Sequence, residues 1–213
     1  MKTALLTLAL ILSTVRLASA QTAADADQPT TPTPSKDDYS LRPSVMLGLS
    51  QWLVFGGGNV AAQLKAGRWV FEYSHGQSLH FQGASSFALS SAERDAGVDI
   101  SMPWTTGGGI GLQITPHLHA LLEVKAHRYE VRGSDPREVA RYTTFTVGPG
   151  VFYDIYLYRG LFVQPIVRFW PTVASTYDDH AVFTRPDGGL YRHEAHRLDL
   201  FVNVNLGWTF SGV

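Results

Sequence analysis

RLDLFVNVNLGWTF, residues 197–210, alternates between apolar side chains and side chains that are mostly polar or small. Successive side chains of a β-strand point to opposite faces, so this segment is predicted to be a strand with one wholly apolar face. The apolar face comprises Leu198, Leu200, Val202, Val204, Leu206, Trp208 and Phe210. At the end of an exported chain, such a strand is typical of the closing strand of a transmembrane β-barrel.

The first twenty residues have the three parts of a secretory signal peptide. Lys2 gives a basic start, residues 4–12 form an apolar run, and Ala18-Ser19-Ala20 predicts cleavage before Gln21. The apolar run is far shorter than the roughly 20 residues that a membrane-spanning helix needs. The chain contains no cysteine, so an exported product of this sequence has no disulfide to stabilise it.

Composition separates a lead-in segment from the rest of the chain. Residues 21–40 contain Pro29, Pro32 and Pro34 and have no apolar periodicity, so we expect a flexible periplasmic segment there. The remainder, 41–213, is expected to be one barrel domain. The formal net charge is −1, and removal of Lys2 and Arg16 makes the mature chain more acidic, which gives no reason to expect nucleic acid as a partner.

Alternating segments separated by turn residues predict an all-β fold, an eight-stranded antiparallel up-and-down barrel. In the segment 98–114 the apolar residues are all even-numbered, so they are expected on one face, across the small residues 105–109. Long loops are predicted at 83–96, 133–138 and 185–189, whereas the connection 55–58 is short. Short turns of such barrels lie in the periplasm, so an even strand number places both termini there. The predicted strands are about 44–54, 59–65, 69–81, 98–114, 118–127, 144–155, 161–170 and 197–210.

Alternation alone does not decide which face of the strands points outward. In a soluble, lipocalin-like carrier the apolar face points inward, and in a membrane barrel it meets lipid. The polar face here is rich in Gly, Ser, Thr, Asn and Gln, which suits a packed lumen, and aromatic residues gather near the predicted strand ends, as interfacial girdles require. The expected girdles are Trp69, Tyr156, Tyr158, Trp208 and Phe210 at the periplasmic level and Phe55, Trp104, Tyr129 and Trp170 at the outer level.

The leader, the eight strands and the terminal Leu206-Gly207-Trp208-Thr209-Phe210 resemble the small outer-membrane barrels of the OmpA and OmpX type. The resemblance implies that Leu206, Trp208 and Phe210 form a signal read by the barrel-insertion machinery, and that the protein is a monomer surrounded by outer-membrane lipid. In that family the chain ends on the aromatic residue itself. Here Ser211, Gly212 and Val213 follow Phe210.

Five charged residues on four predicted strands share the polar face: Glu72, Glu123, Lys125, Asp154 and Arg168. Charges in a lumen this narrow must be paired and hydrogen-bonded. An internal salt-bridge plug is therefore expected rather than an ion pathway.

Small outer-membrane barrels also include lipid A deacylases and acyltransferases, in which Ser and His act by nucleophilic chemistry. The adjacent pair Ser74 and His75 suggests that alternative, but neighbouring residues of a strand point to opposite faces. We therefore expect a non-enzymatic barrel with an envelope-structural or surface-interaction role and without cofactor. His193 and His196 are three apart, so they are expected to face opposite ways and not to share a metal ion. The candidate metal ligands near the outer half and the loops are His75, His80, His180, His193, His196, Asp178, Asp179 and Glu194.

Overall fold

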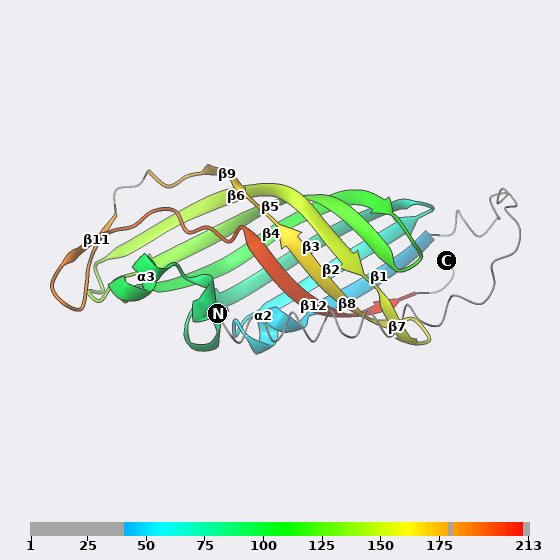
Figure 1. The fold of residues 1–213 in the computed structure, drawn as a ribbon, viewed down its shortest axis with the longest axis horizontal. Helices are drawn as coiled ribbons and strands as arrows, with labels where there is room; N and C mark the ends of the chain where they lie inside the picture. Colours follow the sequence, from blue (N-terminus) through cyan, green and yellow to red (C-terminus); the bar gives the residue numbers. More distant parts are fainter. Residues whose placement is uncertain (1–40, 179–180, 211–213) are drawn as a thin grey trace, which may run out of the picture. The chain divides into compact units, whose positions relative to one another are not determined.

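The computed structural model describes residues 41–178 and 181–210, apart from the side chain of Ala84. The predicted signal peptide, the segment 21–40, Asp179, His180 and residues 211–213 lie outside the described residues. Eight antiparallel strands close into a barrel (Figure 1). Its strands are β1 (Leu41–Gly48), β2 (Gly58–Ala66), β3 (Trp69–His80), β4 (Asp99–Gln113), β5 (Leu118–Arg132), β6 (Val139–Tyr153), β8 (Leu161–Phe169) and β12 (Leu200–Thr209).

Neighbouring strands of the barrel are consecutive in the chain, and β12 completes the ring between β8 and β1. The pairs Gly150–Arg168, Val151–Val167 and Phe152–Ile166 join β6 to β8. Two short strands extend this ladder at its ends: β7 (Ile155–Tyr158) pairs with β8, and β9 (Thr172–Ser175) pairs with β6. The predicted eight-stranded up-and-down barrel is confirmed.

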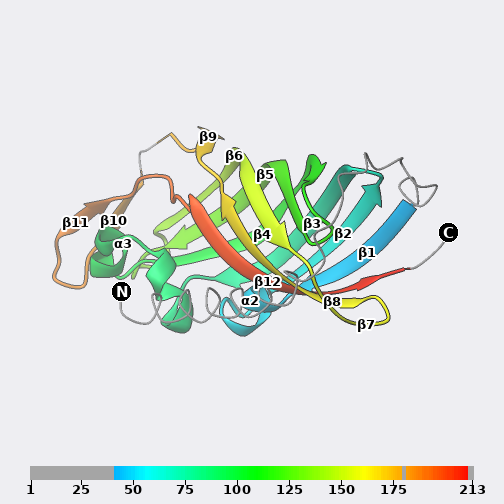
Figure 2. The same cartoon turned by 45° about the vertical axis from the view of Figure 1, so that its right-hand side comes forward.

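The two ends of the barrel carry different structures (Figures 1 and 2). Ser44 near the start of β1 pairs with Thr209 at the end of β12, so both described ends of the chain lie at one end of the barrel. Strands β3 to β6 extend toward the other end, which we call the loop end. It carries η3 (Gly83–Ala88), α3 (Ser91–Ala96) and the separate hairpin of β10 (Val182–Thr184) and β11 (Leu190–Arg192).

The wall is apolar outside and polar inside over most of its height. On β12, Val202 is 40% exposed on the outer face, whereas its neighbour Asn203 is 1% exposed and points inward. The same alternation runs along β5, where Leu122 and Val124 are exposed and Glu123 is buried. On β12 and β5 the outward-facing residues are therefore the ones that the sequence predicted, and the barrel has the surface of a transmembrane barrel.

The predicted first strand is wrong beyond Gly48. Residues Leu49–Leu53 form a helical turn, α2, instead of continuing β1. The pairing of β1 with β12 ends at Gly48, and beyond it two hydrogen bonds of Ser50 connect α2 to β12. The Ser50 amide donates to Asn203 Oδ1 and the Ser50 hydroxyl accepts from the Val204 amide, both at 3.3 Å. The first connection is consequently longer than the predicted turn at 55–58.

The predicted parity of the segment 98–114 is also wrong. The register between β4 and β5 shifts between Ser101 and Trp104, which marks a β-bulge. Because the extra residue moves every later side chain to the opposite face, Ile100 is fully buried while Ile110 is 47% exposed. On β3, Ser78 has a positive φ of 56°, and beyond it Leu79 turns inward.

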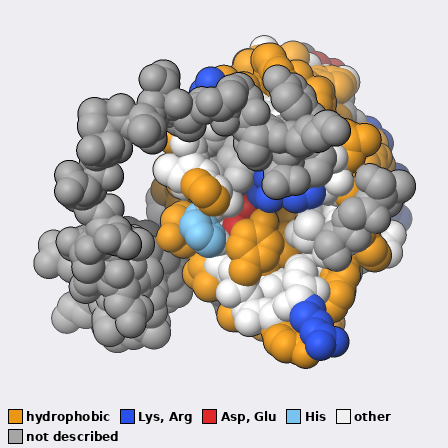
Figure 3. All heavy atoms as spheres, turned by 90° about the vertical axis from the view of Figure 1, so that its right-hand side faces the viewer, with side chains coloured by type: hydrophobic (Ala, Val, Ile, Leu, Met, Phe, Trp, Pro, Cys, Tyr) orange, Lys and Arg blue, Asp and Glu red, His pale blue; other side chains and the backbone are white. Residues whose placement is uncertain are grey.

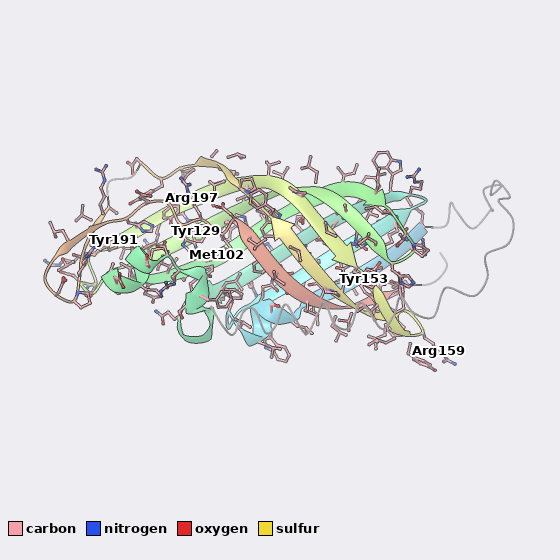
Figure 4. All side chains as sticks on the ribbon, in the orientation of Figure 1. Met102, Tyr129, Tyr153, Arg159, Tyr191 and Arg197 are labelled. Atoms are coloured by element: carbon pink, nitrogen blue, oxygen red, sulfur yellow. The ribbon has the colours of Figure 1, made fainter. Side chains whose placement is uncertain are left out.

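These inward turns create an apolar core inside the loop end of the barrel, in which Met102 and Tyr129 lie (Figure 4). Three residues that were predicted to form the outer aromatic girdle belong to this core instead: Phe55, Tyr129 and Trp170 are at most 6% exposed. Trp104 is half-buried on the wall, and Trp69, Tyr156, Tyr158, Trp208 and Phe210 at the other end are exposed, as predicted. Burying these aromatic side chains gives the loop end a large apolar contact area, which the polar part of the lumen lacks.

Candidate functional site

Arg168 of β8 lies in the lumen between two carboxylates, one from β3 and one from β5. Its Nη2 donates to Glu72 Oε1 at 2.7 Å, and its Nε donates to Glu123 Oε2 at 3.0 Å. Trp170 Nε1 donates to the same Glu123 oxygen at 3.2 Å. All four side chains are buried, so the charges are neutralised by each other and not by water.

A second cation, Lys125, completes this central cluster. Lys125 Nζ is 3.6 Å from Glu123 Oε1 and donates to Ser74 Oγ. Small residues make room for these side chains: a Cβ on Gly109 would lie 2.7 Å from Glu123 Cγ, and one on Gly150 would lie 2.6 Å from Glu123 Oε2. Gly109 of β4 and Gly150 of β6 therefore leave the space that the Glu123 side chain occupies.

Asp154 belongs to a separate ion pair nearer the end at which β1 begins. Lys65 Nζ donates to Asp154 Oδ2, and Gln164 Nε2 donates to Asp154 Oδ1 at 2.8 Å. Lys65 is a further lumenal charge that was not among the five predicted. Its place on the polar face of β2, beside Gln63, was the available signal.

Amides link the two ion clusters into one network. Gln63 Nε2 donates to Glu72 Oε2 at 3.3 Å and lies 3.2 Å from Nε2 of His119, which stands beside Asp154. Asn205 Nδ2 donates to Gln164 Oε1 at 3.1 Å, and Asn205 Oδ1 accepts from Asn203 Nδ2 at 2.6 Å. Viewed from the end at which β1 begins, charged side chains are visible inside the ring, and hydrophobic side chains line parts of its outer edge (Figure 3).

The lumenal charges balance, and little space remains among them. Lys65, Lys125 and Arg168 face Asp154, Glu72 and Glu123, three cations against three carboxylates. A cavity of about 20 Å³ lies between Lys125, Gln51 of α2 and the loop-end core. That volume holds about one water molecule. The arrangement is that of a packed interior, which a carrier for an apolar ligand does not have.

The loop end is closed above the charges by buried polar pairs. Glu93 of α3 accepts from the Ser90 amide at 2.6 Å and contacts His196 Nδ1 at 2.8 Å. Burial raises the pKa of Glu93, but the hydrogen bond and charge of His196 and the hydrogen bonds from Ser90 together lower it to about 2. The Tyr142 hydroxyl accepts from the His196 amide at 2.8 Å and lies 2.9 Å from His193 Nε2. Residues 193–199 therefore pack inward over the core.

This packing corrects the prediction for the two histidines. Residues 193–199 form no regular strand, so His193 and His196 both point into the interior and are both buried. Their partners are tyrosines and Glu93. Within 41–178 and 181–210, no three His, Asp or Glu side chains gather as a metal site would require.

Ser74 and His75 are not brought together. Ser74 is buried in the lumen against Lys125, whereas His75 lies on the outer side of the same strand. Neither belongs to a serine–histidine pair within hydrogen-bond distance in the described part of the chain.

The three residues assigned to the insertion signal lie together on the outside of the final strand. Leu206, Trp208 and Phe210 are all exposed. The Phe210 amide donates to the carbonyl of Pro43 at 2.9 Å, which ties the end of the chain to β1. Their side chains remain available to lipid or to another protein.

The chain matches no protein-family model and no curated protein sequence. Among solved structures it is similar to a major outer membrane protein from Thermus thermophilus, at 12% identity and a TM-score of 0.45, over 80% of this chain and all of the other. It is also similar to the outer membrane protein Ail of Yersinia pestis, at 10% identity and a TM-score of 0.43, again over 80% of this chain and all of Ail. Within the described residues, no helix is long and apolar enough to cross a membrane. The fold assignment rests on this chain's own strand pairing.

Proposed function

We propose that this chain is a non-enzymatic integral protein of a bacterial outer membrane, with a structural role in the envelope or a role in surface interaction through its loop end. The observation that carries the proposal is the sorting of side chains across the wall. Large apolar residues such as Val202, Leu122 and Phe71 face outward on strands all around the ring, while the ion pairs face inward. In water this surface would be an aggregation hazard, whereas in lipid it is the required one.

The packed lumen supports a role without transport. Six buried charges neutralise one another across it, and the apolar core and α3 fill its loop end. A barrel of eight strands is just wide enough for side chains to fill its interior. In the proposed monomer the wall of the barrel would contact membrane lipid, and the loop end would face the outside of the cell.

Orientation follows from the same proposal. Short turns join β2 to β3 and β4 to β5 at the end where β1 begins, while helices and the β10–β11 hairpin occupy the loop end. Barrels of this class keep short turns in the periplasm, so we propose that β1 begins and β12 ends on the periplasmic side. Leu206, Trp208 and Phe210 would then be presented to the barrel-insertion machinery from the periplasmic side.

Cell fractionation combined with a heat-modifiability gel tests the proposal. We expect the mature protein in the outer-membrane fraction, with an unheated band that migrates differently from the boiled one, because a closed barrel resists detergent until it is heated. A protein found in the soluble periplasm, without such a shift, would overturn the assignment.

A further inference from the structure

Arg128 is a cation on the outer wall of the barrel that no carboxylate neutralises in the described part of the chain. It is half-buried, and the one hydrogen bond of its side chain within the described residues runs from Nη1 to Thr143 Oγ1 at 3.4 Å. The other wall arginines nearby are paired: Arg132 Nε and Arg141 Nε each donate to Glu130 at 2.6 Å. Its charge is partly removed from water and has no counter-charge among the described residues, so an anionic ligand beside it would be favourable.

Arg128 stands where the apolar wall of β5 ends. From Leu118 to Ala126 the outward-facing residues of β5 are apolar, and from Arg128 onward they are charged. On β6 the same change occurs between Phe145 and Thr143, which is paired with Arg128, and on β4 the partner of Arg128 is Trp104. A tryptophan beside an arginine at the end of an apolar band is typical of the membrane interface.

We propose that Arg128, with Thr143, binds the phosphate of a lipid headgroup. Arg128 and Thr143 are register partners, and Arg128 Nη1 lies 3.4 Å from Thr143 Oγ1, so one guanidinium group and one hydroxyl stand side by side. The neighbouring Arg141 is already paired with Glu130, whose carboxylate faces the same side of the wall. Guanidinium groups match phosphate oxygens in geometry and charge. The lipid is favoured over free phosphate because the wall directly beneath, at Ala126 and Phe145, is apolar and suits its acyl chains.

The inference rests on the proposed membrane location, and its test separates the two. The chain has no native cysteine, so a fluorophore is placed at Ala126→Cys, below the site, or at Ala62→Cys on the distant wall of β2. The barrel is reconstituted in phosphatidylcholine vesicles with a small fraction of brominated phosphatidic acid or, separately, the same fraction of brominated phosphatidylcholine. Brominated chains quench a fluorophore that they touch.

At Ala126→Cys we expect phosphatidic acid to quench several-fold more than phosphatidylcholine, and at Ala62→Cys the two lipids should quench equally. Arg128→Gln should weaken the preference about fivefold, since one basic residue at a membrane surface contributes about a factor of five in binding. Arg159→Gln is the matched control, because Arg159 stacks on Tyr158 in the turn after β7, far from the site (Figure 4).

Equal quenching by both lipids at Ala126→Cys, or an unchanged preference in Arg128→Gln, would overturn the inference. Loss of the preference on addition of millimolar inorganic phosphate would show a site for the free ion and would equally overturn it. Failure of both lipids to quench at both positions would instead count against the membrane location. Heat-modifiability of each variant confirms that it is folded.

Discussion

Arg168 is bonded to both Glu72 and Glu123, and no other guanidinium among the described residues reaches either carboxylate. Arg168→Met should therefore leave two buried carboxylates without their main counter-charge. Removing one partner of a buried ion pair costs about 3–5 kcal/mol, and the loss should appear as a lower unfolding temperature on a heat-modifiability gel. Arg132→Met, at an exposed pair with Glu130, is the control and should change stability by about 0–1 kcal/mol. Equal stability of the two variants would contradict the role assigned to Arg168.

The Glu93 carboxylate predicts how acid affects the docking of α3. Its pKa is lowered from 4.5 to about 2, so its stabilising contribution is complete above about pH 4.5 and is lost as the pH falls toward about 2. The protection factors of the α3 amides, which correct for the intrinsic slowing of exchange in acid, should fall in that window. In Glu93→Gln the protection factors should be lower at neutral pH and should not fall further between about pH 4.5 and 2. The α2 helix, LSQWL, has no titratable side chain and is the internal control. Acid loss of α3 protection that is as large in Glu93→Gln would contradict this account.

At the residue scale, the types of side chain in the lumen could be predicted, but their partners could not. Parity along one strand identifies Glu123 and Arg168 as inward-facing. Which side chains meet across the lumen depends on the stagger of strands that are far apart in sequence. Asp154 was therefore grouped with four charges, although its partner is Lys65. Tyr129 and Trp170 share parity with Lys125 and Arg168, and this parity predicts their inward direction, whereas their position near strand ends wrongly predicts an outer girdle.

At the scale of elements, the β-bulge of β4 can be tested directly. Ile100 and Ile110 have the same parity, yet Ile100 packs in the loop-end core and Ile110 faces outward. A thiol at Ile100→Cys should resist both water-soluble and lipid-soluble maleimides until the barrel is unfolded. A thiol at Ile110→Cys should react with the lipid-soluble reagent. If both positions react alike in the folded barrel, β4 has no parity switch.

The two faces of a strand could be predicted where the apolar and polar residues alternate without interruption. They could not be predicted where a bulge moves the apolar residues to the other face or where the strand ends in a helical turn. β5 keeps one parity over all 15 residues, so its two faces follow from the sequence. The bulge in β4 adds a residue at Met102 and Pro103, where the apolar spacing shows no break. α2 was not predicted because the sequence LSQWL is compatible with the alternation of a strand. Its helical turn depends on the hydrogen bonds of Ser50 with β12, which are distant in sequence.

At the scale of the whole molecule, the filled interior predicts negligible single-channel conductance in planar bilayers. The ion clusters block one part of the lumen, and the aromatic core with the segment 193–199 blocks the loop end. A wider porin inserted in the same membrane provides the positive control. A steady and reproducible open channel formed by this barrel would contradict the packed lumen.

The central claim is that the apolar face of the wall meets lipid and the polar face is packed inside. Val202 and Asn203 are neighbours on β12 with opposite directions. A fluorophore on Val202→Cys should be quenched strongly by lipids with brominated acyl chains, whereas Asn203→Cys should label poorly or be little quenched. Ready labelling of Asn203→Cys from water, with no lipid quenching at Val202→Cys, would contradict the account. Successive side chains of a strand alternate between its two faces, so that result would mean that the apolar face points inward.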